Sequence, residues 1–150
     1  MGAEIVAVDI SEDKLALAES LGASATFNAA STEAGKELKR QGGVHVALVT
    51  SASQAAYETA FYALRPTGTL LVVGLPAEKI CFPPIMMAAT EVCIYASAVG
   101  TRQDLAEVLA MEADGKLGCQ VGTRPLNQAN EVLEELRFGQ ISGRIALVPA

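Results

Sequence analysis

The stretch that decides the fold is residues 3–14, AEIVAVDISEDK. Its apolar run from Ile5 to Val8 predicts a buried strand, which Asp9 closes. Ser11 can cap a helix after it, and the acidic residues that follow suit the positive N-terminal end of that helix. A strand that ends in an acid and turns directly into a helix starts a β–α unit, and the question is what the carboxylate binds.

The rest of the chain repeats this alternation. Helices of about ten residues between short β-branched runs imply crossover connections and therefore a parallel sheet. The sequence predicts the α/β class, with one doubly wound layer over residues 1–150. Further strands are expected in 25–29, 44–50, 68–74, 92–100 and 143–149, and helices in 11–22, 32–43, 54–66, 83–90, 101–115 and 127–139, where Thr101 and Asp104 form a capping box.

Composition limits the function classes. The 150 residues are 51% hydrophobic and 19% charged, as in a globular domain, and their net charge is −6. That charge argues against electrostatic capture of nucleic acid or of an anionic membrane. No apolar run approaches the ~20 residues of a membrane span, and no signal peptide is visible. Cys81, Cys93 and Cys119 lie far apart, so buried free thiols in a reducing cytoplasm are expected rather than disulfides.

Asp9 has two interpretations. In dinucleotide-binding folds an acid at the end of the second strand accepts hydrogen bonds from the adenosine ribose, and its charge disfavours the 2′-phosphate of NADP. The alternative is that Asp9 only caps the turn. The ribose acid should lie ~20 residues after a G-x-G-x-x-G loop. Only eight residues precede Asp9 and no such loop occurs elsewhere, so either Asp9 is a cap or the loop lies upstream of this chain.

Five segments in order resemble the coenzyme domain of zinc-dependent, medium-chain alcohol dehydrogenases, closest to the bacterial and yeast-like branch. They are MGAEIVAVDISEDKLALAESLGA (1–23), GGVHVALVTSAS (42–53), GTLLVVGLP (68–76), SAVGTRQDLAEVL (97–109) and GQISGRIALV (139–148). The resemblance implies a Rossmann-like doubly wound sheet that lacks its first strand and glycine-rich loop. It also implies NAD as cofactor and a small alcohol or aldehyde as the parent enzyme's substrate, with hydride passing from a zinc-bound alcohol to NAD.

The resemblance assigns four positions to the adenosine and pyrophosphate end of NAD. Asp9 matches the ribose acid, Ile10 packs on adenine, and Lys14 reaches the ribose. Arg144 matches an arginine that pairs with the pyrophosphate, a role that suits a fixed cation with several donors. From the residues alone, the preferred interpretation of Lys14 is a solvated helix lysine, and the alternative for Arg144 is a surface arginine at the start of a strand.

The nicotinamide end takes the other positions. Thr50 and Ser51 end a strand at the edge where open α/β sheets bind ligands, although both could also cap the next helix. Ser97 and Val99 match positions whose main-chain groups bind the carboxamide. The segment along the nicotinamide ring consists of Val73, Gly74 and Leu75, where the glycine is either a close approach to the ring or a plain turn residue.

Other family parts have no counterpart in the sequence. The catalytic and structural zinc ligands of the family precede this segment, and His45 stands alone on a strand, so neither metal ligands nor catalytic residues are predicted. We expect a partial NAD(P)-binding domain, with Met1 in a frame that starts within the parent sequence. Two alternatives stay open, a non-catalytic binding or assembly module and a fragment of another medium-chain oxidoreductase such as a polyol dehydrogenase.

The absent first strand has a physical consequence. In this fold that strand is central, so without it the segments EIVAVD and VHVALV present apolar edges. The sequence therefore predicts a homo-oligomer or a poorly soluble chain. It also predicts weak NADH binding, because the glycine loop normally holds the pyrophosphate.

Overall fold

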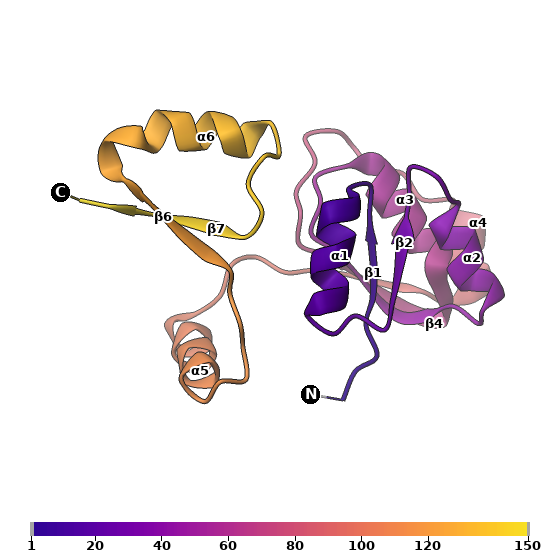
Figure 1. The fold of residues 1–150 in the computed structure, drawn as a ribbon. Helices are drawn as coiled ribbons and strands as arrows, with labels where there is room; N and C mark the ends of the chain where they lie inside the picture. Colours follow the sequence, from indigo (N-terminus) through magenta and orange to yellow (C-terminus); the bar gives the residue numbers. More distant parts are fainter. Residues whose placement is uncertain (1, 150) are drawn as a thin grey trace. The chain divides into compact units, whose positions relative to one another are not determined.

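The computed structural model describes residues 2–149, which divide into two compact units, one ending at Val99 and one starting at Gly100. Figure 1 shows the first unit as strands alternating with helices. None of the described helices is long and apolar enough to cross a membrane. The elements of the first unit are β1 (Val6–Asp9), α1 (Glu12–Ser20), β2 (Ala25–Asn28), α2 (Ala34–Arg40), β3 (Val44–Val49), α3 (Gln54–Ala63), β4 (Leu64–Val72), α4 (Pro84–Thr90) and β5 (Cys93–Ala96).

The second unit is smaller. It consists of α5 (Arg102–Ala113), β6 (Val121–Pro125), the single 3-10 turn η1 (Leu126–Gln128), α6 (Ala129–Arg137) and β7 (Arg144–Val148). Strands β6 and β7 form a parallel pair, with α6 in the connection between them (Figure 1). The sequence did not predict β6, because a five-residue strand that contains a glycine and ends in a proline carries a weak β signal.

Every strand pair is parallel, which confirms the α/β class. The hydrogen-bonded strands form three sheets, β1–β2, β3–β4–β5 and β6–β7, where one layer was expected. Among the described residues β1 pairs only with β2, and β3 only with β4. Each of these two strands therefore has one edge without a ladder partner.

The junction between α3 and β4 differs from the sequence prediction. Helix α3 ends at Ala63 and β4 begins at the next residue, although a strand start near Gly68 was expected. The ladder pairs Val44 with Leu64 and then Val46 with Thr69, so one residue of β3 stands opposite four of β4. Pro66, which was expected to end the helix, lies within this irregular part of β4, where a proline is tolerated because the ladder is interrupted.

The core lies between the β3–β4–β5 sheet and the helices packed on one of its faces. Its buried cluster consists of Val49, Tyr57, Leu64 and Leu70, and Leu70 is 0% exposed. The three cysteines lie outside this core. Cys81, Cys93 and Cys119 are free and exposed, so the expectation of buried thiols was wrong.

Candidate functional site

The positions that the sequence singled out in the first unit gather at strand ends. In a parallel sheet the carboxyl ends of the strands lie at one edge, where open α/β folds bind ligands. Because β3, β4 and β5 belong to one sheet, the residues that follow them share that edge. The positions at or directly after strand ends are Asp9 for β1, Thr50 and Ser51 for β3, Val73 and Gly74 for β4, and Ser97 for β5.

Asp9 is anchored through one of its two carboxylate oxygens. Its Oδ1 accepts hydrogen bonds from the backbone N–H groups of Ile10 (2.8 Å) and Ser11 (2.9 Å). Its Oδ2 accepts no hydrogen bond from any other described residue. Asp9 is thus a turn cap whose second oxygen points to no partner in this part of the chain, and the two interpretations of this acid are compatible.

The neighbours of Asp9 are open to solvent. Ile10 is 72% exposed, a large apolar side chain directly beside the carboxylate. Lys14 lies on the first turns of α1, is exposed, and forms no ion pair with a carboxylate of residues 2–149. An exposed apolar surface next to an acid and a lysine is an arrangement that an adenosine could contact.

Gly74 is required by packing between two strand ends. A Cβ added there would lie 2.4 Å from the carbonyl oxygen of Ser51 and 2.6 Å from the carbonyl carbon of Thr50. The Gly74 N–H also donates to the carbonyl of Val49 at 2.8 Å. This contact is a third reason for the glycine, beside the approach to a ring and the plain turn, and it joins the ends of β3 and β4.

Tyr57 contacts Gly74 through a hydrogen bond, and the sequence did not predict this contact. The Tyr57 side chain is buried, and its hydroxyl donates a hydrogen bond to the Gly74 carbonyl. Burial raises the pKa of the Tyr57 phenol above its ordinary value, because the charged form would lose its hydration. The available signal was the spacing of Tyr57 and Phe61, four residues apart on α3, which marks a buried helix face.

The remaining positions contribute main-chain groups or exposed side chains. The Ser97 N–H donates to the Val72 carbonyl at 2.9 Å and prolongs the β4–β5 ladder by one residue. Val99 is fully exposed and has a φ of 45°, a strained conformation for a β-branched residue. Leu75 is exposed beyond the end of β4. Arg144 belongs to the second unit, where it begins β7 and its guanidinium donates to the Gly143 carbonyl at 2.9 Å.

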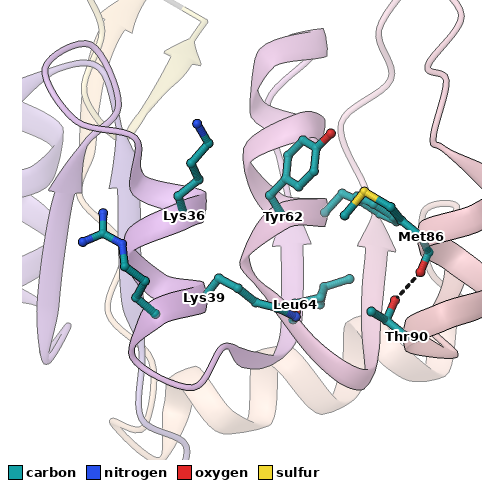
Figure 2. Close-up of a pocket in the computed structure, with 8 residues that line it drawn as sticks. Lys36, Lys39, Tyr62, Leu64, Met86 and Thr90 are labelled. Carbon is teal, nitrogen blue, oxygen red and sulfur yellow. Dashed lines mark hydrogen bonds between the residues drawn. The ribbon is translucent and has the colours of Figure 1, made fainter.

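A separate hollow of about 310 Å³ lies among α2, α3 and α4, and none of the predicted positions lines it (Figure 2). Its floor is apolar, with Phe61 and Leu64. The cations on its rim already have partners: two form ion pairs within α2 and its cap, and the Lys39 ammonium donates to the Leu64 carbonyl. Lysine stems that cover apolar surface in this way account for the hollow without a ligand.

No metal site is formed by the residues that the structure describes. Within 2–149 no three histidine, cysteine, aspartate or glutamate side chains gather where they could hold a metal ion. His45 is exposed on β3. The donors that zinc requires are therefore not supplied by these residues.

Comparisons with known proteins agree with this geometry. Residues 1–114 match the protein family described as zinc-binding dehydrogenase. An alcohol dehydrogenase of Geobacillus stearothermophilus is 41% identical over 148 residues, which cover 98% of this chain and 44% of that enzyme. The crystal structure of an alcohol dehydrogenase from Aeropyrum pernix superimposes with a TM-score of 0.91 at 36% identity, covering 98% of this chain and 43% of the other.

A further solved structure includes the coenzyme. Acetophenone reductase from Geotrichum candidum, solved in complex with NAD, matches with a TM-score of 0.85 at 26% identity over 97% of this chain and 42% of its own. The chain thus spans less than half the length of the proteins it matches. The matches confirm the resemblance and the Rossmann-like α/β fold. With the family matched over residues 1–114, this chain belongs to the zinc-binding dehydrogenases.

Proposed function

We propose that this chain forms the coenzyme-holding part of an NAD-dependent alcohol dehydrogenase. The observation that carries the proposal is the Asp9 carboxylate at the end of β1, with one oxygen held by the turn and the other without a partner among the described residues. A carboxylate fixed in this way is oriented to accept hydrogen bonds from a ribose diol. NAD, when bound, supplies the hydride acceptor in the whole enzyme.

The preference for NAD over NADP follows from the charge of the same group. An NADP molecule would carry its 2′-phosphate where NAD presents a hydroxyl, and the Asp9 carboxylate would repel that phosphate. Lys14 lies in the first turn of α1 and forms no ion pair with a described carboxylate, so it remains available to the ribose. Ile10 offers an exposed apolar surface to the adenine.

The nicotinamide end is proposed at the β3–β4–β5 edge. Gly74 is fixed by the Ser51 backbone and by Tyr57, so the exposed Val73 beside it is held at the strand end, where a ring could lie against it. Leu75 extends the same apolar surface. Thr50 and Ser51 supply hydroxyls at this edge, and the main-chain groups of Ser97 and Val99 are proposed to bind the carboxamide. Arg144 is proposed separately as the partner of the pyrophosphate.

A second proposal, assembly into a homo-oligomer, rests on β5. Within the described part of the chain this strand pairs only with β4, and all four of its residues are exposed, including Tyr95 at 61%. An exposed apolar strand edge invites pairing with another chain. An assembly module without catalysis, or part of another medium-chain oxidoreductase such as a polyol dehydrogenase, would have the same edge, so β5 alone does not separate these functions.

Location and further partners are proposed from charge and thiols. Three free, exposed cysteines suit a reducing compartment such as the cytoplasm. A net charge of −6 disfavours nucleic acid and anionic membranes as partners. Small molecules, NAD and an alcohol or aldehyde, are the partners proposed for the whole enzyme.

The coenzyme proposal is tested by removing the charge of Asp9. In Asp9→Asn the preference for NADH over NADPH should fall about tenfold, because the amide no longer repels the 2′-phosphate of NADPH. A tenfold change in this ratio corresponds to ~1.4 kcal/mol. Titration calorimetry at high protein concentration measures both affinities, since weak binding is expected. Asp13→Asn is the matched control, with the same charge change on the exposed start of α1. An unchanged ratio in Asp9→Asn, or an equal change in the control, removes Asp9 from the ribose role.

A further inference from the structure

The hydroxyl of Tyr57 is a polar group inside an apolar core. Tyr57 lies at the end of the first turn of α3, and its side chain, 2% exposed, belongs to the buried core cluster of the first unit. A phenylalanine would fill the same space without a hydroxyl that needs a hydrogen-bond partner when it is buried. The hydroxyl has one such partner among the described residues, the carbonyl of Gly74. This hydrogen bond is therefore what the hydroxyl adds to the packing of the ring.

The segment that follows β4 has one flexible joint, at Gly74. Glycine lacks a Cβ, so its backbone can adopt many conformations. Leu75 is followed by Pro76, and the residue before a proline is restricted to extended conformations. On the other side of the joint, the N–H groups of Val73 and Gly74 both donate to the carbonyl of Val49, at 3.1 and 2.8 Å. Rotation about the backbone bonds of Gly74 is thus the main freedom left in this segment, and it would change the direction of Leu75.

The hydrogen bond from Tyr57 opposes this rotation. The Gly74 carbonyl and the Leu75 N–H belong to one planar peptide unit. In a trans peptide these two groups point in opposite directions, and residues 2–149 contain no cis peptide bond. The hydroxyl therefore turns the Leu75 N–H away from Tyr57 and sets the direction in which the chain continues. Because the Leu75 side chain is 78% exposed, its own contacts do little to hold it.

We propose that Tyr57 is a positioning residue for the nicotinamide ring of NAD, which it orients through Gly74. The exposed side chains of Val73 and Leu75 lie on the two sides of this glycine, and its conformation decides whether they offer one apolar surface to a planar ring. The inference rests on the proposed coenzyme function and adds a buried residue to it. The effect of Tyr57 should be confined to the nicotinamide half of NAD, because Asp9 ends β1, which belongs to another sheet.

The test compares two ligands that differ in the nicotinamide. ADP-ribose carries the adenosine, the pyrophosphate and the second ribose of NADH, but no nicotinamide. We expect Tyr57→Phe to weaken NADH binding about fivefold, as for the loss of one hydrogen bond, and to leave ADP-ribose binding unchanged. Titration calorimetry at high protein concentration measures both affinities. Tyr62→Phe is the matched control, since it makes the same change at a partly exposed tyrosine of the same helix, and it should affect neither ligand.

The outcomes separate this role of Tyr57 from the coenzyme proposal. An equal loss of affinity for NADH and ADP-ribose in Tyr57→Phe would mean that the hydroxyl only stabilises the fold, and would overturn the positioning role. Unchanged NADH binding in this variant would overturn it too, while the proposed role of Asp9 would stand. If the original chain bound neither ligand, the coenzyme proposal and the positioning role would both be overturned.

A second measurement needs no coenzyme. Nitrogen-15 relaxation of the free chain reports how rigid the backbone is at Gly74 and Leu75. We expect order parameters of about 0.85 in the original chain and below about 0.6 in Tyr57→Phe, values typical of rigid and of flexible backbone. Strand β5 should stay rigid in both, and the far-ultraviolet spectrum establishes that the variant is folded. Gly74 and Leu75 that remain rigid in Tyr57→Phe would overturn the proposal, even if NADH binding were weaker.

Discussion

The two units of this chain contrast in how much they bury. Among the described residues 2–149, nine of the ten buried hydrophobic residues belong to the first unit, and Val132 alone belongs to the second. Helix α5 has no buried residue at all, although it has a complete capping box. A well-formed helix therefore does not imply a core, because a core requires a wide sheet with helices packed on it.

The difference arises from the sheets. The first unit packs α2 and α3 against a three-stranded sheet, while the second unit has only the two-stranded pair β6–β7. Two strands bury too little apolar surface to be stable by themselves. We therefore expect the first unit to unfold as one cooperative transition and the second to open locally at lower free energy.

The largest effect should come from the centre of the first core. Leu70→Ala removes a side chain that is 0% exposed and should lower the free energy of unfolding by about 2–5 kcal/mol. Leu133→Ala makes the same change in α6 at a leucine that is 59% exposed, and should cost less than about 0.5 kcal/mol. Urea unfolding followed by circular dichroism measures both. Similar losses of unfolding free energy in the two variants would show that the second unit has a core that stabilises it as much as the first core does.

The next effect concerns the edge that links β3 and β4. Gly74→Ala forces a Cβ against the Ser51 backbone and should cost about 1–3 kcal/mol, since backbone yields less readily than a side chain. Gly118→Ala is the control, because a Cβ there meets nothing within 4 Å. Urea midpoints measure both, and NADH titration should show weaker binding only for Gly74→Ala. A stable Gly74→Ala variant would refute the packing explanation of this glycine.

A smaller effect is expected from the hydroxyl that holds Gly74. Tyr57→Phe removes the hydrogen bond to the Gly74 carbonyl and should cost about 1 kcal/mol at neutral pH. Burial raises the pKa of Tyr57, so the unfolded chain loses this proton first, near pH 10.0. The stability that depends on the neutral phenol is thus complete below pH 10.0 and is lost as pH rises through the folded-state pKa.

The control for this change is the partly exposed Tyr62, on the same helix. Stability measured between pH 8 and pH 11 should fall less steeply in Tyr57→Phe than in the original chain, because one of the shifted groups is gone. Tyr62→Phe should retain the steep fall. If stability falls equally steeply with pH in both variants, burial does not raise the pKa of Tyr57.

Features set by neighbouring residues were predictable, and features set by distant contacts were not. The capping box of Thr101 and Asp104 and the strand at Asp9 follow from spacing within a few residues, and the structure confirms both. The need for glycine at position 74 depends on Ser51, which only the β3–β4 pairing brings close. The cysteines were expected to be buried from their residue type, but all three are exposed, because burial is decided by tertiary packing and not by residue type.

The smallest effect is expected at the start of α5, in the unit without a core. The Thr101 backbone N–H donates to the Asp104 carboxylate at 2.6 Å, and this bond, together with the Thr101 hydroxyl, lowers the pKa of Asp104. The carboxylate therefore stabilises the helix start above the unfolded pKa, and this contribution is lost as pH falls through the lower folded-state pKa. The protection of the α5 amides, which is the intrinsic exchange rate divided by the observed rate, should fall when the pH drops from 6 to 3.

Asp104→Asn should remove this acid dependence in α5, while Asp13→Asn, at the start of α1, should leave it intact. Because α5 has no buried residue, neither change should move the urea midpoint of the first unit. A shift of that midpoint in Asp104→Asn would show that the two units unfold together. In that case, α5 would contribute to the stability of the first unit even though the helix itself has no buried side chain.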